Sequence, residues 1–238
     1  MDLSPFFKPS GPGVLNEHQA KLLLKQYGIP VIQEHPVKDA DEAVRAARHV
    51  GYPMVVKAMG SRLLHKTEMG LVCLNLGDEA AVRQAVTVIQ QKAGDDLEGL
   101  LIQPQITGQR ELMVGLFRDP QFGPVITFGL GGVLAEALDD VAMAVAPLTE
   151  TDALEIIGQV RAQKLLSSFR GEQAVDTPKL VGAILGLSRL AMDHPEISEV
   201  DINPLRVTPK GTLLAVAQIL NKKFSISCAP IDVCVTSG

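Results

Sequence analysis

The sequence predicts an α+β fold. Helical patterns are interspersed with mostly short strands, and some of those strands alternate polar and apolar residues, as half-buried antiparallel strands do. A single series of βαβ units does not describe this order. The chain has 238 residues, of which 46% are hydrophobic, and this is enough for one large domain or two small lobes with buried cores.

Both ends of the chain differ from the middle. Residues 1–15 (MDLSPFFKPSGPGVL) are rich in Pro, Gly and Ser, and we expect them to form an arm. Residues 223–238 lose the periodicity that precedes them, and we expect them to form a tail. We find no internal repeat or low-complexity tract.

Two amphipathic helices are predicted first. One begins at the cap residue Asn16, ends at Gly28, and has apolar residues at helical spacing, namely Ala20, Leu23, Leu24 and Tyr27. The other covers about 39–50 and stops at Gly51-Tyr52-Pro53, and its apolar face consists of Ala43, Val44 and Ala47.

Strands dominate the middle of the chain. Apolar runs and alternating patterns predict strands over 54–58, 71–76, 100–105, 111–117 and 124–128. A helix is predicted over 78–93, with Val82, Ala85, Val86 and Ile89 on one face. The fifth strand runs directly into Gly129-Leu130-Gly131-Gly132.

The last third is predicted to contain two helices and two strands. Thr149 and Asp152 have the spacing of a capping box, which predicts that a helix begins at Thr149. A second helix covers about 177–192. Strands follow over 199–207 and 212–219, and Thr208-Pro209-Lys210-Gly211 between them is typical of a hairpin turn.

The composition argues against several classes of protein. The formal charge is −5, and the 22 Lys and Arg residues are scattered, so the basic stripe of a nucleic-acid-binding protein is missing. Three cysteines form neither an even disulfide framework nor a CxxC pair, which indicates a reducing compartment. With no signal-peptide pattern and no apolar run near the ~18 residues of a membrane span, we expect a cytoplasmic protein.

Three isolated features have the residue types needed to bind a nucleotide. Lys57 lies on a predicted buried strand, where a lysine either faces a ligand or extends its ammonium to the surface. The glycines at 129–132 have backbone amides that could bind phosphate, although an ordinary tight turn has the same composition. Asp201 and Asn203 are two residues apart and therefore share a strand face, where their oxygens suit Mg²⁺; an exposed Asp before an Asn-Pro turn is the alternative.

The order of the motifs is more specific than any one of them. Six motifs follow one another along the chain: GYPMVVK (51–57), LHKTEMG (64–70), ELMVG (111–115), RDPQFGP (118–124), GLGG (129–132) and DINPL (201–205). Over about residues 14–220 they strongly resemble the ATP-grasp domain of ADP-forming acyl-CoA synthetases. That family includes the beta subunit of the acetyl-CoA enzyme and is related to the succinyl-CoA synthetase beta chain.

The resemblance implies a two-lobed ATP-grasp fold with nucleotide held between the lobes. We expect a first lobe over 16–100 and a second lobe, with the metal-binding strands, over 101–222. The implied contacts of ATP or ADP are with Lys57, the segment from Gln103 to Ile106 at adenine, Glu111 near the ribose or phosphates, and Gly131 and Gly132. Asp201 and Asn203 match the metal-binding strand, where they would hold Mg²⁺.

The stretch RLLHKTEMG (62–70) contains the most informative histidine. Taken alone, His65 beside Lys66 is typical of a solvated surface pair. The resemblance instead implies that His65 relays phosphate from a histidine of an alpha subunit to ADP, while Lys66 offsets the phosphate charge and Glu68, usually Asp in the family, orients the imidazole. A purely structural His65 is the alternative.

One position departs from the family pattern. The last strand usually reads like AVDAR, with an aspartate that binds metal, whereas here it reads Ala215-Val216-Ala217-Gln218-Ile219. Asp201 and Asn203 then carry only one charge between them. Either water or Gln218 rebuilds the site, or the chain binds nucleotide without efficient turnover.

These features lead to three functional hypotheses. The first is the ATP-grasp subunit of an acyl-CoA synthetase, which makes ATP from ADP with the energy of an acyl-CoA thioester and requires an alpha subunit with the CoA site and the first phosphohistidine. The second is a nucleotide-binding or regulatory module with impaired catalysis, which Ala217 favours. The third is an ATP-grasp ligase that passes an acyl phosphate to an amine, and His65 argues against it.

Overall fold

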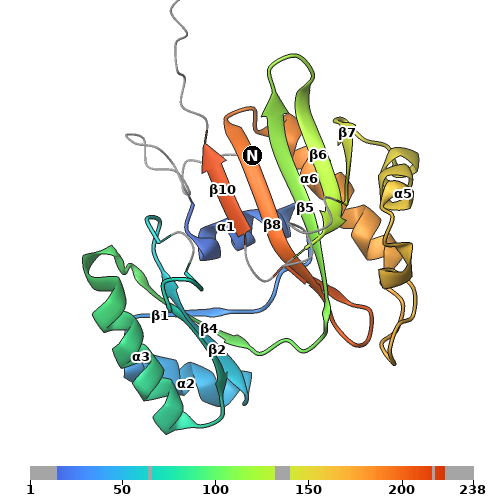
Figure 1. The fold of residues 1–238 in the computed structure, drawn as a ribbon. Coiled ribbons are helices and arrows are strands. Elements are labelled where there is room, and N and C mark those ends of the chain that lie inside the picture. Colours follow the sequence, from blue (N-terminus) through green and yellow to red (C-terminus); the bar gives the residue numbers. More distant parts are fainter. Residues whose placement is uncertain (1–14, 64–65, 132–139, 216–217, 223–238) are drawn as a thin grey trace, which may run out of the picture.

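Two lobes, each built on its own β-sheet, make up the molecule. The computed structural model describes residues 15–63, 66–131, 140–215 and 218–222. Figure 1 shows the smaller sheet with its two helices at the lower left and the larger sheet with its helices at the right. The predicted α+β class and two-lobed arrangement are confirmed.

The smaller lobe has a four-stranded antiparallel sheet. Its strands lie in the order β1 (His35–Val37), β4 (Gly99–Pro104), β2 (Met54–Met59) and β3 (Val72–Leu76). Two helices, α2 (Ala40–Val50) and α3 (Glu79–Ala93), cover one face of it (Figure 1). Their apolar stripes pack on Met54, Val56 and Ala58 of β2. The residues that alternate with these along the strand, including Lys57, therefore lie on the opposite face.

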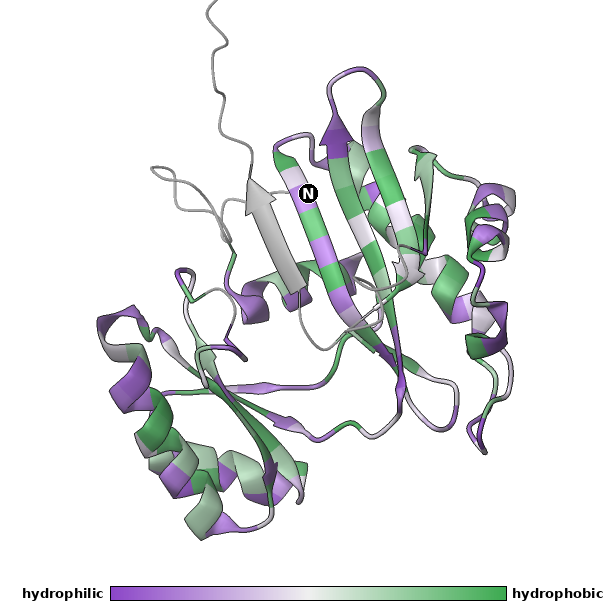
Figure 2. Ribbon diagram, viewed as in Figure 1, coloured by the Kyte–Doolittle hydropathy of each residue, from purple (hydrophilic) through white to green (hydrophobic). Residues whose placement is uncertain are grey.

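The larger lobe has a six-stranded antiparallel sheet. Its strands are β10 (Gln218–Lys222), β8 (Ile197–Val207), β5 (Arg110–Asp119), β6 (Gly123–Leu130) and β7 (Val141–Val145) in that order, with β9 (Leu213–Ala215) also paired to β8. The helices α5 (Glu150–Gln159) and α6 (Thr177–Asp193) cover one face (Figure 1). Figure 2 shows hydrophobic and hydrophilic residues alternating along β8, as expected for a strand with one covered face.

Helix α1 (Glu17–Gln26) divides the chain differently from the expected lobe boundaries. Its apolar residues join the hydrophobic core of the larger lobe, although we had expected residues 16–100 to form the first lobe. The four residues from Leu101 to Pro104 remain in the small sheet, although they were expected in the second lobe. The reason is packing: α1 buries Ala20, Leu23 and Leu24 against the large sheet's core, which sequence spacing does not specify.

Most predicted elements are confirmed, and the differences have local causes. Asn16 and Thr149 form the capping boxes of α1 and α5. The strands β1 and β7 were not predicted. Strand β1 has only three residues and contains Pro36, which is uncommon within strands. The predicted strand over 212–219 is divided into β9 and β10. The connections include two short 3-10 helices, at Gly94–Asp96 and Gln163–Leu165.

A buried arginine at the start of β5 anchors a long connection of the larger lobe. Arg110 is 4% exposed and pairs with Glu172, with 2.9 Å between Nε and Oε2. Its two terminal nitrogens donate to three backbone carbonyls, those of Leu165, Ser167 and Gln173. These four hydrogen bonds of one guanidinium hold the segment between α5 and α6 against β5.

None of the helices in the described ranges is both long and apolar enough to cross a membrane.

The packing of α1 predicts unequal effects of two neighbouring leucines on stability. Leu23 is fully buried in the larger core, whereas Leu22 is 43% exposed. We expect Leu23→Ala to lower the free energy of unfolding by about 2–5 kcal/mol, because it removes core contacts and leaves a cavity. Leu22→Ala, the matched control, should change it by less than about 0.5 kcal/mol. Urea unfolding measures both; equal effects would show that α1 does not pack as described.

Candidate functional site

The predicted nucleotide-binding lysine is buried where α1 meets the small sheet. Lys57 is 6% exposed and lies on β2 between Leu101 of β4 and Val72 of β3. Its ammonium Nζ lies 3.1 Å from Oε1 of Glu17, the first residue of α1. Of the two readings of Lys57, the structure therefore excludes an ammonium extended to bulk solvent.

The Glu17 carboxylate accepts hydrogen bonds from three lysines that lie on three different segments. Its Oε1 also accepts a hydrogen bond from Nζ of Lys21, at 2.7 Å. Its Oε2 accepts one from Nζ of Lys66, at 2.6 Å. The Glu17 side chain is 4% exposed. A single buried carboxylate therefore connects α1, β2 and the turn that follows β2.

A second carboxylate, Glu34, extends this cluster. Its Oε2 lies 2.5 Å from Nζ of Lys21, and its Oε1 lies 2.9 Å from Nδ1 of His18. We define the ion cluster as Glu17, Lys21, Glu34, Lys57 and Lys66. Three ammonium groups and two carboxylates give it one excess positive charge, which favours a bound anion.

Burial and the lysines have opposite effects on the pKa of Glu17. Burial raises this pKa, but the positive charges of Lys57, Lys21 and Lys66 outweigh it, so the pKa lies well below its ordinary value. The pKa of Lys57 is lowered, mainly by burial, although the Glu17 carboxylate opposes that effect. The Glu17 carboxylate thus favours the charged form of the buried Lys57.

The sequence analysis did not single out Glu17, Lys21 or Glu34. A Glu and a Lys four residues apart near a helix start usually form an exposed pair. The available signal was their place on the helix, since Glu17 and Lys21 precede Ala20 and Leu24 by three residues and therefore share the buried side of α1.

The connection between the two sheets contains Gln103 and Ile106. Gln103 is 2% exposed on β4, and its Oε1 is buried with no hydrogen-bond partner in the described structure. Gln103 and Lys57 lie on the same face of the small sheet, since Val55 pairs with Gln103 and Lys57 pairs with Leu101. Ile106 is half-buried in the loop that leads to β5. A buried acceptor without a partner is a candidate for ligand contact.

Glu111 is already engaged by another residue of the larger lobe. Its Oε1 accepts a hydrogen bond from the Arg206 guanidinium on the neighbouring strand β8. Arg206 also donates to the carbonyl of Gly108, at 3.2 Å. A nucleotide at this position would therefore share Glu111 with Arg206.

Asp201 and Asn203 lie on one face of β8, as predicted. Val200 and Ile202 between and beside them point into the core, while Asp201 and Asn203 are half-buried on the other face. Burial raises the pKa of Asp201, and the negative charge of Glu199 on the same face adds to that effect.

Gly131 lies close to Asn203. A Cβ atom at Gly131 would lie 2.5 Å from the carbonyl oxygen of Leu112 and 3.1 Å from Oδ1 of Asn203. Only glycine fits there without a shift of the backbone. The backbone of Gly131 thus lies directly beside one of the predicted metal ligands.

Other predicted residues are placed in part. His65, Gly132 and Ala217 lie outside the described residues. Glu68 is exposed in the turn after β2, and Lys66, in the same turn, belongs to the ion cluster.

No group of three or more His, Cys, Asp and Glu side chains within the described ranges is arranged to hold a metal ion. Asp201 and Asn203 nevertheless offer a carboxylate and an amide oxygen on one face, which are donors that Mg²⁺ accepts when nucleotide phosphates and water complete its shell. The described residues therefore fit a Mg²⁺ ion that is bound together with a nucleotide. They do not by themselves supply a complete set of protein ligands.

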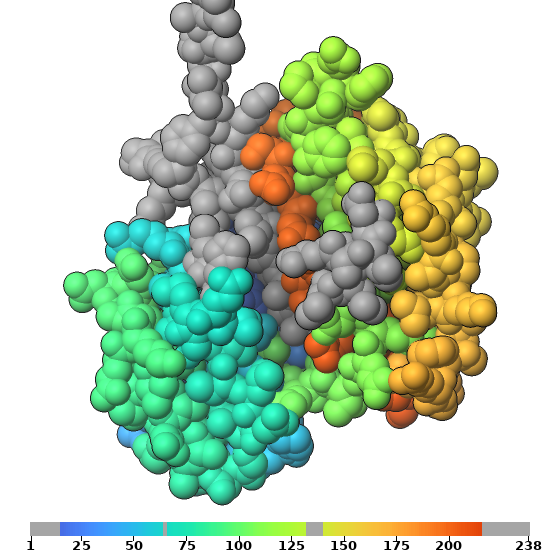
Figure 3. Space-filling model, in the orientation of Figure 1, coloured from blue at the N-terminus to red at the C-terminus, as the bar shows by residue number. Residues whose placement is uncertain are grey.

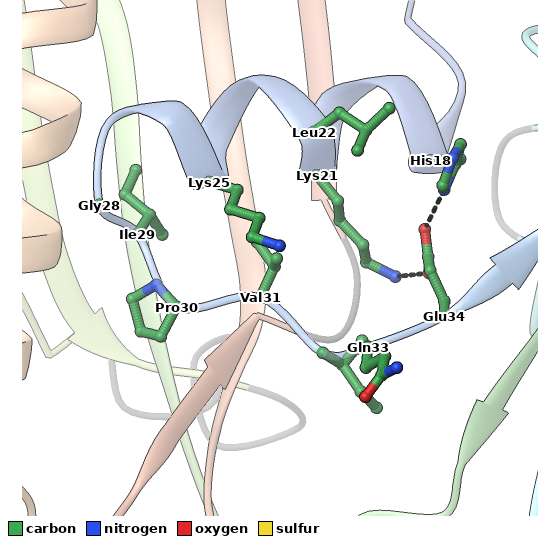
Figure 4. Close-up of a pocket in the computed structure, with 11 residues that line it drawn as sticks. His18, Lys21, Leu22, Lys25, Gly28, Ile29, Pro30, Val31, Gln33 and Glu34 are labelled. Carbon is green, nitrogen blue, oxygen red and sulfur yellow. Dashed lines mark hydrogen bonds and ion pairs between the residues drawn. The ribbon is translucent and has the colours of Figure 1, made fainter. Parts of the chain in front are cut away.

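A surface pocket of about 670 Å³ lies between α1 and the chain from Gly28 to Glu34 (Figure 4). His18, Lys21, Lys25 and Glu34 contribute to its wall. None of the predicted nucleotide or metal residues lines this pocket.

In Figure 3, atoms of β8 (orange) are visible on the face that lies toward the small lobe.

Comparisons with known proteins agree with this architecture. Residues 7–220 match the family model of an ATP-grasp domain. The chain is 41% identical over 196 residues to the beta subunit of acetate–CoA ligase (ADP-forming) I of Pyrococcus furiosus, which covers 80% of this chain and 84% of that subunit. It is 38% identical to the acetate–CoA ligase (ADP-forming) I of Archaeoglobus fulgidus, but there it spans only 28% of the relative's length.

A solved structure is similar over nearly the whole chain. Acetyl-coenzyme A synthetase 1 of Ca. Korarchaeum cryptofilum, in complex with coenzyme A and Ca-AMPCP, is 39% identical, with a TM-score of 0.83, over 88% of this chain and 93% of that one. The same synthetase with Mg-AMPPCP has its phosphohistidine segment pointing towards the nucleotide binding site, and its TM-score is 0.77.

The ion cluster predicts that one buried lysine matters greatly for stability. Lys21 is 2% exposed and lies between Glu17 and Glu34, so Lys21→Met leaves two buried carboxylates with one cation fewer. We expect the free energy of unfolding to fall by about 3–5 kcal/mol. Lys25→Met, an exposed control on the same helix, should change it by less than about 0.5 kcal/mol. Similar denaturation midpoints for both variants would contradict the cluster.

Proposed function

The chain belongs to the ATP-grasp domain family, and we propose that it is the nucleotide-binding β subunit of an ADP-forming acyl-CoA synthetase. The reaction converts acyl-CoA, ADP and phosphate into a carboxylic acid, CoA and ATP. The observation that supports this most strongly is the 41% identity to a separate β subunit of an acetate–CoA ligase, spanning 84% of that subunit.

Other parts of the synthetase would come from outside this sequence. The chain spans only 28% of a single-chain relative, so most of that enzyme has no counterpart in these 238 residues. We propose that an alpha subunit supplies the CoA site and the first phosphohistidine. That partner would also select the acyl group.

The proposed nucleotide site lies between the two sheets. Lys57 would neutralise phosphate from the small lobe, and Gln103, with its unpaired buried oxygen, would accept a hydrogen bond from the nucleotide base near Ile106. Glu111 would lie near the ribose, and the amides at Gly131 and Gly132 would donate to phosphate.

Asp201 and Asn203 would hold the Mg²⁺ that accompanies the nucleotide. Such an ion would offset phosphate charge during transfer. The role of this chain is to present two oxygens on the exposed face of β8, beside the close approach of Gly131.

His65 is proposed to relay the phosphoryl group. A nitrogen of its imidazole attacks the phosphorus of the partner's phosphohistidine, so that one N–P bond forms as the other breaks. A terminal oxygen of ADP then attacks the same phosphorus and releases His65. Positioning and charge neutralisation are the main demands of such transfers, and Lys66 would supply positive charge while Glu68 orients the ring.

The relay predicts an acid-labile phosphoryl group on His65. After incubation with Mg-ATP, alone and with the presumed alpha partner, intact-mass measurement should find one added phosphoryl group on the wild type and none on His65→Ala. His49→Ala, which removes an exposed histidine of α2, should be labelled like the wild type. Equal labelling of His65→Ala would assign the group to another residue and contradict the relay.

The metal ligands predict a second, separate result. Because Ala217 stands where the family has an aspartate, Ala217→Asp adds a carboxylate, and we expect Mg²⁺-dependent ADP affinity to rise about tenfold or more. Asp201→Asn should lower it by a similar factor. Calorimetric titration with Mg²⁺ and with EDTA measures both. If only Ala217→Asp, and never the wild type, is phosphorylated by Mg-ATP, the chain is a nucleotide-binding module with impaired catalysis.

A further inference from the structure

We propose that Glu17 is a positioning residue that sets Lys57 and Lys66 for phosphate binding. One carboxylate accepts a hydrogen bond from Lys57 on Oε1, at 3.1 Å, and from Lys66 on Oε2, at 2.6 Å. The two ammonium groups are thus held on the two oxygens of a single side chain. This inference rests on the proposed nucleotide site, because it assigns the lysines a phosphate ligand.

The two lysines come from different segments, which backbone hydrogen bonds of Leu71 connect: its carbonyl accepts from Ala58 N, at 2.9 Å, and its N–H donates to the Lys66 carbonyl, at 2.8 Å. Lys57 is on the central strand β2, whereas Lys66 lies in the turn that follows it, next to the proposed relay residue His65. Lys66 has a 17% exposed side chain and Glu17 a 4% exposed one. Because Glu17 contacts both, the ammonium ends of the two side chains are held at one carboxylate.

Glu17 is itself held rigidly, which a positioning residue requires. It is the first residue of α1, and the adjacent cap residue Asn16 donates from Nδ2 to Oε2 of Glu98, at 3.0 Å. Glu98 in turn accepts hydrogen bonds from Ser61, through its backbone N and its Oγ. The start of α1 is therefore tied to the small lobe, while the rest of the helix is packed in the larger core.

Glu17 also favours the charged form of Lys57. Lys57 must carry its proton to bind phosphate, and burial lowers its pKa while the Glu17 carboxylate raises it. Among the described residues, the positive charges of Lys21 and Lys66 also act on Lys57, and both lower its pKa. Its strand neighbours Val72 and Leu101 are uncharged.

The sign of the expected pH effect follows directly. Without the Glu17 charge, the pKa of Lys57 falls further below its ordinary value. Nucleotide binding needs the protonated lysine. As the pH rises, the variant therefore loses binding at a lower pH than the wild type does. A residue that only stabilised the fold would reduce the amount of folded protein and leave this alkaline limb in place.

Calorimetric titration of the full chain with Mg-ADP, from about pH 6 to pH 10, tests the proposal. We expect Glu17→Gln to weaken binding about tenfold near neutral pH and to move the alkaline limb downward by about one pH unit or more. Glu17→Asp keeps the charge but is one methylene shorter, so it should show an intermediate shift. If Glu17→Gln fails to fold, as circular dichroism would reveal, Glu17→Asp carries the test.

Glu34→Gln is the matched control. Glu34 has the same 4% side-chain exposure and also binds Lys21, yet the described contacts do not join it to Lys57 or Lys66. Its variant should keep the wild-type limb. Equal shifts for the Glu17 and Glu34 variants, or no shift for Glu17→Gln and Glu17→Asp, would overturn the positioning role. A wild-type chain that binds no Mg-ADP at any pH would overturn the nucleotide site as well, so the two failures are distinguishable.

Discussion

The buried carboxylate of Glu17 is the constraint on which the arrangement of the two lobes and the proposed site depends. Burying charge is costly unless it is paired, and here three lysines from α1, β2 and the following turn converge on one side chain. Removal of Glu17 would leave three buried or half-buried ammonium groups without this shared carboxylate. These contacts, together with the Asn16–Glu98 hydrogen bond, join the start of α1 to the small lobe.

Helix α1 makes apolar contacts with one lobe and polar contacts with the other. Its apolar residues, such as Leu23 and Leu24, belong to the larger core and are non-directional in their attraction. Its first turn forms directional polar contacts, through Asn16 and Glu17, with the small lobe. The helix therefore connects the lobes beside the proposed nucleotide site, and the placement of Lys57 follows from both contributions.

The larger sheet positions its predicted ligands by a simpler rule. Strand β8 alternates between core and open face, so Val200 and Ile202 anchor it while Asp201 and Asn203 remain accessible. The close backbone approach at Gly131 brings a second segment to the same place. Half-burial, with the negative charge of Glu199 beside it, raises the pKa of Asp201, and a nearby cation would oppose that effect.

The sequence by itself determined the local elements and the identity of the family. Cap residues such as Asn16 and Thr149, and the alternation around Asp201, depend only on neighbours along the chain, so they could be predicted. Only the tertiary structure decided that α1 joins the larger core and that Glu17, Lys57 and Lys66 meet. Contacts between residues 40 and 49 positions apart depend on how separate elements pack, and the i,i+4 pairing of Glu17 with Lys21 gives no sign of them.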